Sequence, residues 1–164
     1  MAIKKAYFAG GCFWCMMPVF RAFGAKEIRS GYSGGEEVNP TYEDVKHQKT
    51  GHRETVMIAY DPDVTSYEKL LKIFLANIDP YDDGGQFIDR GHSYTTAVYY
   101  TDEDEKNMAE KAIDALEKES GKKCTVVIEK LKVFYEAEEY HQDYDIKNPE
   151  AMEKELIESG RKKA

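Results

Sequence analysis

Residues 10–15 read GGCFWC and hold two of the chain's three cysteines and its only tryptophan. A short strand is predicted at residues 4–9, and a helix over residues 19–23 that Gly24 ends. Cys12 is therefore expected at or near a helix N-terminus, where unpaired N–H groups and the helix dipole favour an anion. A thiol in that place gains thiolate character, which nucleophilic sulfur chemistry requires.

Pro18 restricts the helix that follows Cys12. A proline deep inside a helix clashes with the carbonyl group four residues earlier. The sequence leaves two alternatives: the regular helix begins just before Pro18, or it is kinked there.

The chain of 164 residues is expected to form one domain over residues 1–164. Its net charge is −8, and its basic residues are spread out, so no nucleic-acid footprint is present. No apolar run approaches membrane-spanning length, and no N-terminal stretch resembles a signal peptide. We therefore expect no membrane partner and a cytoplasmic location.

Predicted strands alternate with amphipathic helices along the chain. Strands are expected at residues 4–9, 25–30, 54–60 and 94–100, with one long strand or a hairpin pair at 125–135. Helices are expected at residues 39–45, 65–78, 102–120 and 149–160. This pattern predicts an α+β or α/β two-layer sandwich, in which helices flank a mixed β-sheet. The order of the strands does not follow from the sequence.

Local signals refine these bounds. Thr41 is expected to cap the second helix, and Thr65 the third, with Glu68 completing a capping box. Gly121 is expected to stop the helix over residues 102–120. The glycine-rich residues 31–35 are expected to break regular structure, and the long loop at 79–93 is expected to be functional.

Cys12 and Cys15 are spaced to bridge, since helical spacing places their α-carbons within disulfide range. A zinc site is a second interpretation, but Cys124 and four scattered histidines supply no second ligand pair of recognisable spacing. A redox pair is favoured, and neither a metal nor a cofactor is predicted. Phe13 and Trp14 between the cysteines suit an apolar pocket around Cys12.

Other polar residues admit plain structural explanations. His52 and Glu54 are favoured as the polar start of a strand, while Asp89 serves equally well to orient a neighbour or to cap a turn. Cys124 is expected to be structural or incidental. Residues 140–144, YHQDY, are too polar for ordinary core and too clustered for an average surface, so we expect a pocket wall.

Six motifs together resemble the A class of peptide methionine sulfoxide reductases. In chain order they are GCFW at 11–14, GYSGG at 31–35, NPTY at 39–42, GHRE at 51–54, DxGxxY at 89–94 and YHQDY at 140–144. The resemblance spans about residues 7–144 and favours the subgroup with cysteine after the tryptophan.

The resemblance implies a two-layer α/β sandwich and reduction of the S epimer of methionine sulfoxide, free or in proteins, as an oxidative-stress repair. Cys12 would be the nucleophile. The resemblance implies that Phe13 and Trp14 cradle the substrate methyl group and that Tyr42 and Tyr94 hydrogen-bond the sulfoxide oxygen. Asp89 would support the site from behind these residues. Further substrate contacts are expected from Glu54, Tyr140 and His141.

The chemistry fits these residues. A thiolate attacks a sulfoxide only if the oxygen is protonated or strongly hydrogen-bonded as it leaves. Attack yields methionine and a sulfenic acid on Cys12, which a second thiol converts to a disulfide. Cys15 is the nearest candidate, and an external dithiol, thioredoxin by resemblance, would reduce the disulfide. The rivals are a module that binds methionine sulfoxide without turnover and a general dithiol oxidoreductase.

Met17 departs from the expected pattern. The resemblance, as we interpret it, places the proton-donating glutamate five residues after the nucleophile, and methionine occupies that position. Impaired activity is therefore expected, unless another acid such as Glu54 supplies the proton. On this interpretation, Met17→Glu would raise the rate.

Overall fold

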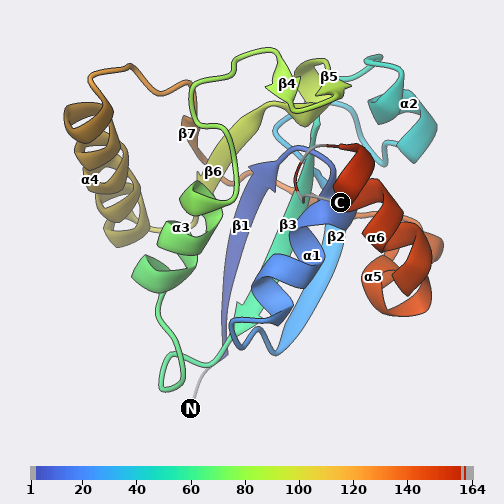
Figure 1. The fold of residues 1–164 in the computed structure, drawn as a ribbon, viewed down its shortest axis with the longest axis horizontal. Helices are drawn as coiled ribbons and strands as arrows, with labels where there is room; N and C mark the ends of the chain where they lie inside the picture. The colour runs from blue at the N-terminus through green and yellow to red at the C-terminus, as the bar shows by residue number, and fades with distance from the viewer. Residues whose placement is uncertain (1–2, 160, 162–164) are drawn as a thin grey trace.

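The computed structural model describes residues 3–159 and residue 161. Its main feature is a six-stranded sheet in the order β7-β6-β1-β3-β2-β8, in which only β6 and β7 run parallel. The strands are β1 (Lys4–Gly10), β2 (Glu27–Ser33), β3 (Arg53–Tyr60), β6 (Thr96–Tyr100), β7 (Val127–Lys130) and β8 (Phe134–Glu136). The fold is therefore a mixed sheet with flanking helices, as predicted (Figure 1).

The helices connect and cover these strands. They are α1 (Phe13–Arg21), α2 (Tyr42–Lys46), α3 (Tyr67–Ala76), α4 (Glu103–Ser120), α5 (Tyr144–Lys147) and α6 (Pro149–Glu158), with single 3-10 turns at η1 (His92–Tyr94) and η2 (Glu139–His141). In Figure 1, α1 lies in front of the central strands, and α5 and α6 lie beside it. None of the helices in the described ranges is both long and apolar enough to cross a membrane.

The main core lies between the sheet and helices α1 and α3. Alternate residues of a strand face opposite sides, so Ala6 and Phe8 of β1 join this core while Ala9 joins a smaller cluster on the other face. The ring of Phe8 stacks on Phe20 of α1 and on Phe74 of α3, with centroids 5.7 and 4.9 Å apart. The core thereby fixes α1 against the sheet and sets where its N-terminus lies.

The segment at residues 125–135 differs from the prediction. It forms neither one strand nor a hairpin, because β7 pairs with β6 at one edge of the sheet and β8 pairs with β2 at the other. Gly31 admits β8, since an added β-carbon there would collide with the ring of Phe134. The alternation of apolar and polar residues predicts a strand, but it does not identify the neighbouring strand with which it pairs.

The structure excludes one of the two alternatives for the first helix and corrects one predicted break. The first helix begins at Phe13 and continues through Pro18, so it does not start just before the proline. Proline removes one bond from the helical ladder, whereas Phe13 and Met16 anchor the first turns in the core. Strand β2 continues to Ser33, because both of its neighbours hydrogen-bond it there, so the break begins only at Gly34.

Two of the capping predictions are confirmed. The Thr41 hydroxyl accepts from the Asp44 N–H, and Gly121 ends α4 in the left-handed conformation. The cap of α3 is Ser66, one residue after the predicted Thr65, and its hydroxyl accepts from the Lys69 N–H. Lys69 therefore holds the third helical position, so the capping box predicted with Glu68 does not form. Helix α6 begins with proline as expected, and its predicted end at Gly160 lies outside the described residues.

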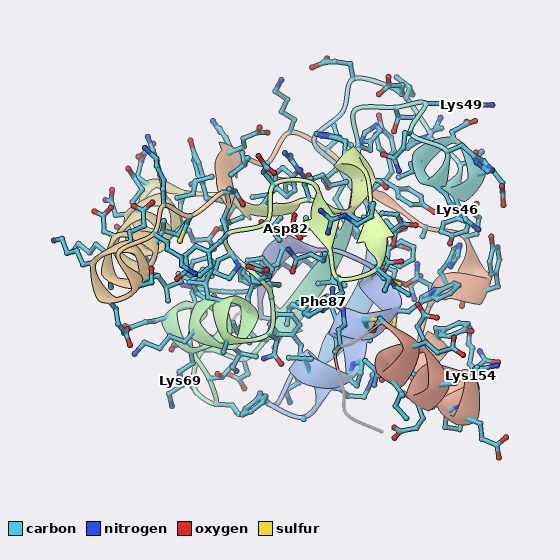
Figure 2. The ribbon with its side chains drawn as sticks, turned by 45° about the horizontal axis from the view of Figure 1, so that its top comes forward. Lys46, Lys49, Lys69, Asp82, Phe87 and Lys154 are labelled. Carbon is cyan, nitrogen blue, oxygen red and sulfur yellow. The ribbon has the colours of Figure 1, made fainter. Side chains whose placement is uncertain are left out.

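The predicted loop at residues 79–93 contains a small hairpin of β4 (Gly85–Gln86) and β5 (Asp89–Arg90). An ion pair of 2.7 Å between Arg90 and Asp82 braces it, and Gln86 bonds the backbone of Asp79. Figure 2 shows this loop, with Asp82 and Phe87 labelled, near α6, which carries Lys154. Tyr94 follows in η1 rather than at the predicted start of a strand.

Candidate active site

The N-terminus of α1 sets the position of Cys12, which is the N-cap residue. Gly11 before it has φ +91°, a conformation that L side chains rarely adopt. A β-carbon at Gly11 would lie 2.6 Å from the Arg161 guanidinium and 2.8 Å from Gln86. The glycine therefore allows β1 to turn into α1 beneath the hairpin, and this turn presents Cys12.

Glu54 approaches the same helix terminus from β3. One carboxyl oxygen accepts from the Phe13 N–H at 3.1 Å, and the other is buried with no hydrogen-bond partner among the described residues. Burial raises the pKa of Glu54 to about 8, despite the opposing effect of the hydrogen bond from the Phe13 N–H. The Glu54 carboxyl group is therefore mostly protonated at neutral pH. Glu54 does lie near the start of a strand, as its sequence position indicates, but that interpretation did not predict its contact with the N-terminus of α1.

The two thiols lie together, as their spacing predicts. Cys15 is fully buried, Cys12 is 7% exposed, and their sulfur atoms are within 4.8 Å. They form a small apolar cluster with Met152 of α6, and Tyr94 packs against it. Both cysteines are free, so the structure shows the reduced form.

The prediction that Cys12 has thiolate character is wrong for the resting protein. The pKa of Cys12 is raised well above its ordinary value, first by its hydrogen bond with Cys15, then by burial and by the negative charges of Glu54 and Asp89. These effects outweigh the helix N-terminus, which favours an anion. The thiol must therefore lose its proton during the reaction rather than before it.

Aromatic rings surround the helix terminus. Trp14 stacks on Tyr144 with centroids 4.1 Å apart and planes 8° apart. Tyr42 stacks on both Trp14 and Phe13 with centroids 6.2 Å apart. The indole N–H of Trp14 donates to Nδ1 of His141 at 2.9 Å. These contacts fix the rings against one another at the N-terminus of α1, next to Cys12.

Tyr42 and Tyr94 reach the site from α2 and η1. Burial is the main reason that the pKa of each phenol is raised, and the charge of Glu54 raises both further. Both groups therefore stay protonated and able to donate. Asp89 of β5 has a raised pKa because of burial, and its Oδ2 has no partner among the described residues.

The motif at residues 140–144 forms a wall beside the site. Gln142 anchors it, since its amide bonds both the N–H and the carbonyl of Ser30 in β2. His141 is fully buried against Trp14, and burial lowers its pKa, whereas Tyr140 is 58% exposed. Tyr144, the last residue of this predicted wall, stacks directly on Trp14.

Met17 does not face the thiols. It is fully buried in the main core with Phe13, Met16 and Phe20, whereas Cys12 and Cys15 belong to a separate cluster. Position 17 is therefore a core position, and the acid at the site is Glu54. The methionine there gives no reason to expect impaired activity.

Cys124 lies away from this cluster. It is half-buried before β7, and its N–H donates to Glu117 of α4 at 2.8 Å. Burial raises the pKa of its thiol. These contacts are structural.

Helix α6 brings one further group to the thiols. The carboxylate of Glu155 and the sulfurs of Cys12 and Cys15 all lie within 4.8 Å of one another. Three possible ligands are one fewer than the closed set of a structural zinc site. No sequence signal in our interpretation pointed to Glu155.

Paired thiols, a protonated carboxyl and phenol donors within an aromatic wall define a cysteine-based oxidoreductase. Comparison with known proteins specifies the class. The family model for peptide methionine sulfoxide reductase matches residues 4–164. The MsrA protein of Bacillus licheniformis is 48% identical over 98% of this chain and 92% of its own length.

Solved structures agree in fold. Reduced Mxr1 of Saccharomyces cerevisiae has a TM-score of 0.85 at 29% identity, covering 90% of this chain and 87% of that one. Mxr1 in complex with Trx2 matches with a TM-score of 0.58 at 22% identity, over 85% and 84% of the two chains. The chain belongs to the peptide methionine sulfoxide reductase family.

Proposed function

We propose that this chain is a single-domain reductase of methionine S-sulfoxide, free or in proteins, with Cys12 as nucleophile and Glu54 as proton donor. The observation that carries the assignment is the Glu54 carboxyl. It is buried beside Cys12 with a pKa of about 8, one oxygen held by the Phe13 N–H and the other without a partner. A sulfoxide oxygen supplies that partner.

The first step transfers oxygen from the substrate to Cys12. Glu54 gives its proton to the sulfoxide oxygen, to which Tyr42 and Tyr94 donate hydrogen bonds. The Glu54 carboxylate then accepts the thiol proton, and the Cys12 sulfur attacks the sulfoxide sulfur. The products are methionine and a Cys12 sulfenic acid, so atoms and protons balance. The wall of Phe13 and Trp14 takes the methyl group.

The second step forms a disulfide. The Cys15 sulfur attacks the sulfenic sulfur, the S–O bond breaks and water leaves. A dithiol partner then reduces the Cys12–Cys15 disulfide by exchange. The yeast Mxr1 complex with Trx2 supports thioredoxin as that partner. The cytoplasm, where thioredoxin keeps thiols reduced, is the proposed location.

Single-turnover release of methionine tests the assignment. The reduced protein, without external reductant, is mixed with the S and the R sulfoxides of a methionine derivative. We expect up to one equivalent of methionine from the S form and almost none from the R form. Binding without release would favour the binding module, and reduction of protein disulfides with no release would favour a general dithiol oxidoreductase.

A further inference from the structure

Glu155 is a charged group that the first step does not use. It lies on α6, which packs over the two cysteines through Met152 and Leu156. Its carboxylate is within 4.8 Å of both sulfurs and is partly buried. Six of the ten α6 residues are exposed, whereas Glu155 is half-buried beside the thiols.

The second step needs a base at this place. Cys15 is fully buried and must lose its proton as its sulfur attacks the sulfenic sulfur of Cys12. Glu54 is held at the Phe13 N–H, and unlike Glu155 it does not lie within 4.8 Å of both sulfurs. A base acts within hydrogen-bond reach or through one water, and apo distances are often longer than those in the reacting complex.

We propose that Glu155 is the general base of the resolving step, a role that rests on the proposed function. Its carboxylate takes the Cys15 proton while the S–S bond forms and the sulfenic S–O bond breaks. The departing hydroxide takes that proton back and leaves as water, so Glu155 ends as a carboxylate. The Cys15 thiol supplies the electron pair that reduces the sulfenic acid, and no other reductant is needed.

The surroundings of Glu155 suit this role. Burial raises its pKa, and so do the charges of Asp89 on β5 and Glu158 on α6, while Arg161 lowers it. The carboxylate is therefore a stronger base than an exposed one. Cys15 also lines a pocket of about 420 Å³ with Leu156 and Arg161, so the resolving thiol has open space beside it.

The test separates the two steps in one experiment. Glu155→Gln is mixed with one equivalent of sulfoxide and quenched over time, and methionine, free thiol and dimedone-trapped sulfenic acid are measured. We expect methionine release at the wild-type rate, disulfide formation slowed about a hundredfold, and accumulation of Cys12 sulfenic acid. Glu150→Gln, an exposed residue of the same helix, is the matched control and is expected to match the wild type.

A pH series distinguishes a base from a structural role. Without Glu155, the rate of disulfide formation should rise about tenfold per pH unit, because hydroxide must remove the thiol proton, whereas the wild-type rate should vary less. Disulfide formation at the wild-type rate in Glu155→Gln would overturn the proposal. Equal slowing of both steps would overturn it as well, since it would mean that the substitution disturbs the site as a whole. Absence of methionine release from the wild type would instead refute the proposed function.

Discussion

Substituting Glu54 by glutamine removes the proposed proton donor and little else. The amide oxygen of glutamine still accepts from the Phe13 N–H, so the helix terminus keeps its partner. General acid catalysis contributes on the order of 10²–10⁴ in rate. We therefore expect Glu54→Gln to slow methionine release by at least about a hundredfold and to change substrate affinity little, because the aromatic wall is untouched.

The pKa of Glu54 sets the pH dependence of the wild type. With a pKa of about 8, the carboxyl is about 90% protonated at pH 7 and about 10% protonated at pH 9. The first-step rate should therefore fall about tenfold between these pH values. Rapid-quench measurement of methionine release over this range checks both statements, with Glu27→Gln, an exposed residue of the neighbouring strand, as control. A variant within threefold of the wild type, or a wild-type rate that rises through pH 8, would refute the reasoning.

Four further substitutions test the rest of the site. Met17→Glu should lower the free energy of unfolding by about 3–5 kcal/mol in urea titrations and give no gain in rate, because it places an unpaired carboxyl in the core. Cys15→Ser should release methionine once and then stop, whereas Cys124→Ser should turn over like the wild type with thioredoxin, and mass mapping of the oxidised wild type should find a Cys12–Cys15 linkage. Tyr94→Phe should slow methionine release about 10- to 100-fold, because a lost hydrogen bond to a developing charge costs about 1.5–3 kcal/mol.

The spacing of apolar residues correctly indicates which face of α1 is buried. The resemblance in motif, in contrast, led us to expect the proton donor at position 17, which lies on that buried face. Phe13, Met16, Met17 and Phe20 follow the i, i+3, i+4, i+7 spacing of one apolar helix face, and the structure buries all four in the core. Position 17 is thereby excluded from the thiol side. Cys15 lies off this face and so meets Cys12.

The two-residue alternation of a strand indicates which way Glu54 points. Alternate strand residues share a face, and Val56, Ile58 and Tyr60 of β3 all belong to the core on the helix side. Glu54, two residues before Val56, therefore points toward the helices. Only the tertiary fold shows that it meets the N-terminus of α1, because the hydrogen bond to Phe13 spans 41 positions of the chain.

Long-range pairing limits what the sequence predicts elsewhere. The strand character of residues 125–135 is local, but the choice of two opposite sheet edges depends on the space that Gly31 leaves for Phe134. The wall at residues 140–144 was recognised from composition, whereas its anchoring depends on Gln142 reaching Ser30, 112 positions away. Glu155 is one of several acidic residues in a polar helix, and only packing brings it to the thiols.

The raised pKa of Glu54 also makes a claim about stability, which a measurement without substrate can test. The folded protein holds this proton up to about pH 8, whereas the unfolded chain releases it near pH 4.5. Between these values the folded state binds more protons than the unfolded state, so the free energy of unfolding falls as the pH rises. A shift of this size corresponds to at most about 5 kcal/mol.

Other buried carboxyls with raised pKa values, such as Asp89 and Glu105, act in the same direction, so the wild-type curve alone does not isolate Glu54. Asp82, whose pKa is lowered to about 2 by Arg90, titrates below this range. Glu54→Gln removes only the one proton, and the comparison of the two proteins is therefore specific. Urea titrations from pH 5 to pH 8.5 should show the variant gaining stability relative to the wild type by several kcal/mol as the pH rises. A constant difference across this range would mean that Glu54 is ionised in the folded protein at neutral pH, and a carboxylate there cannot protonate the sulfoxide.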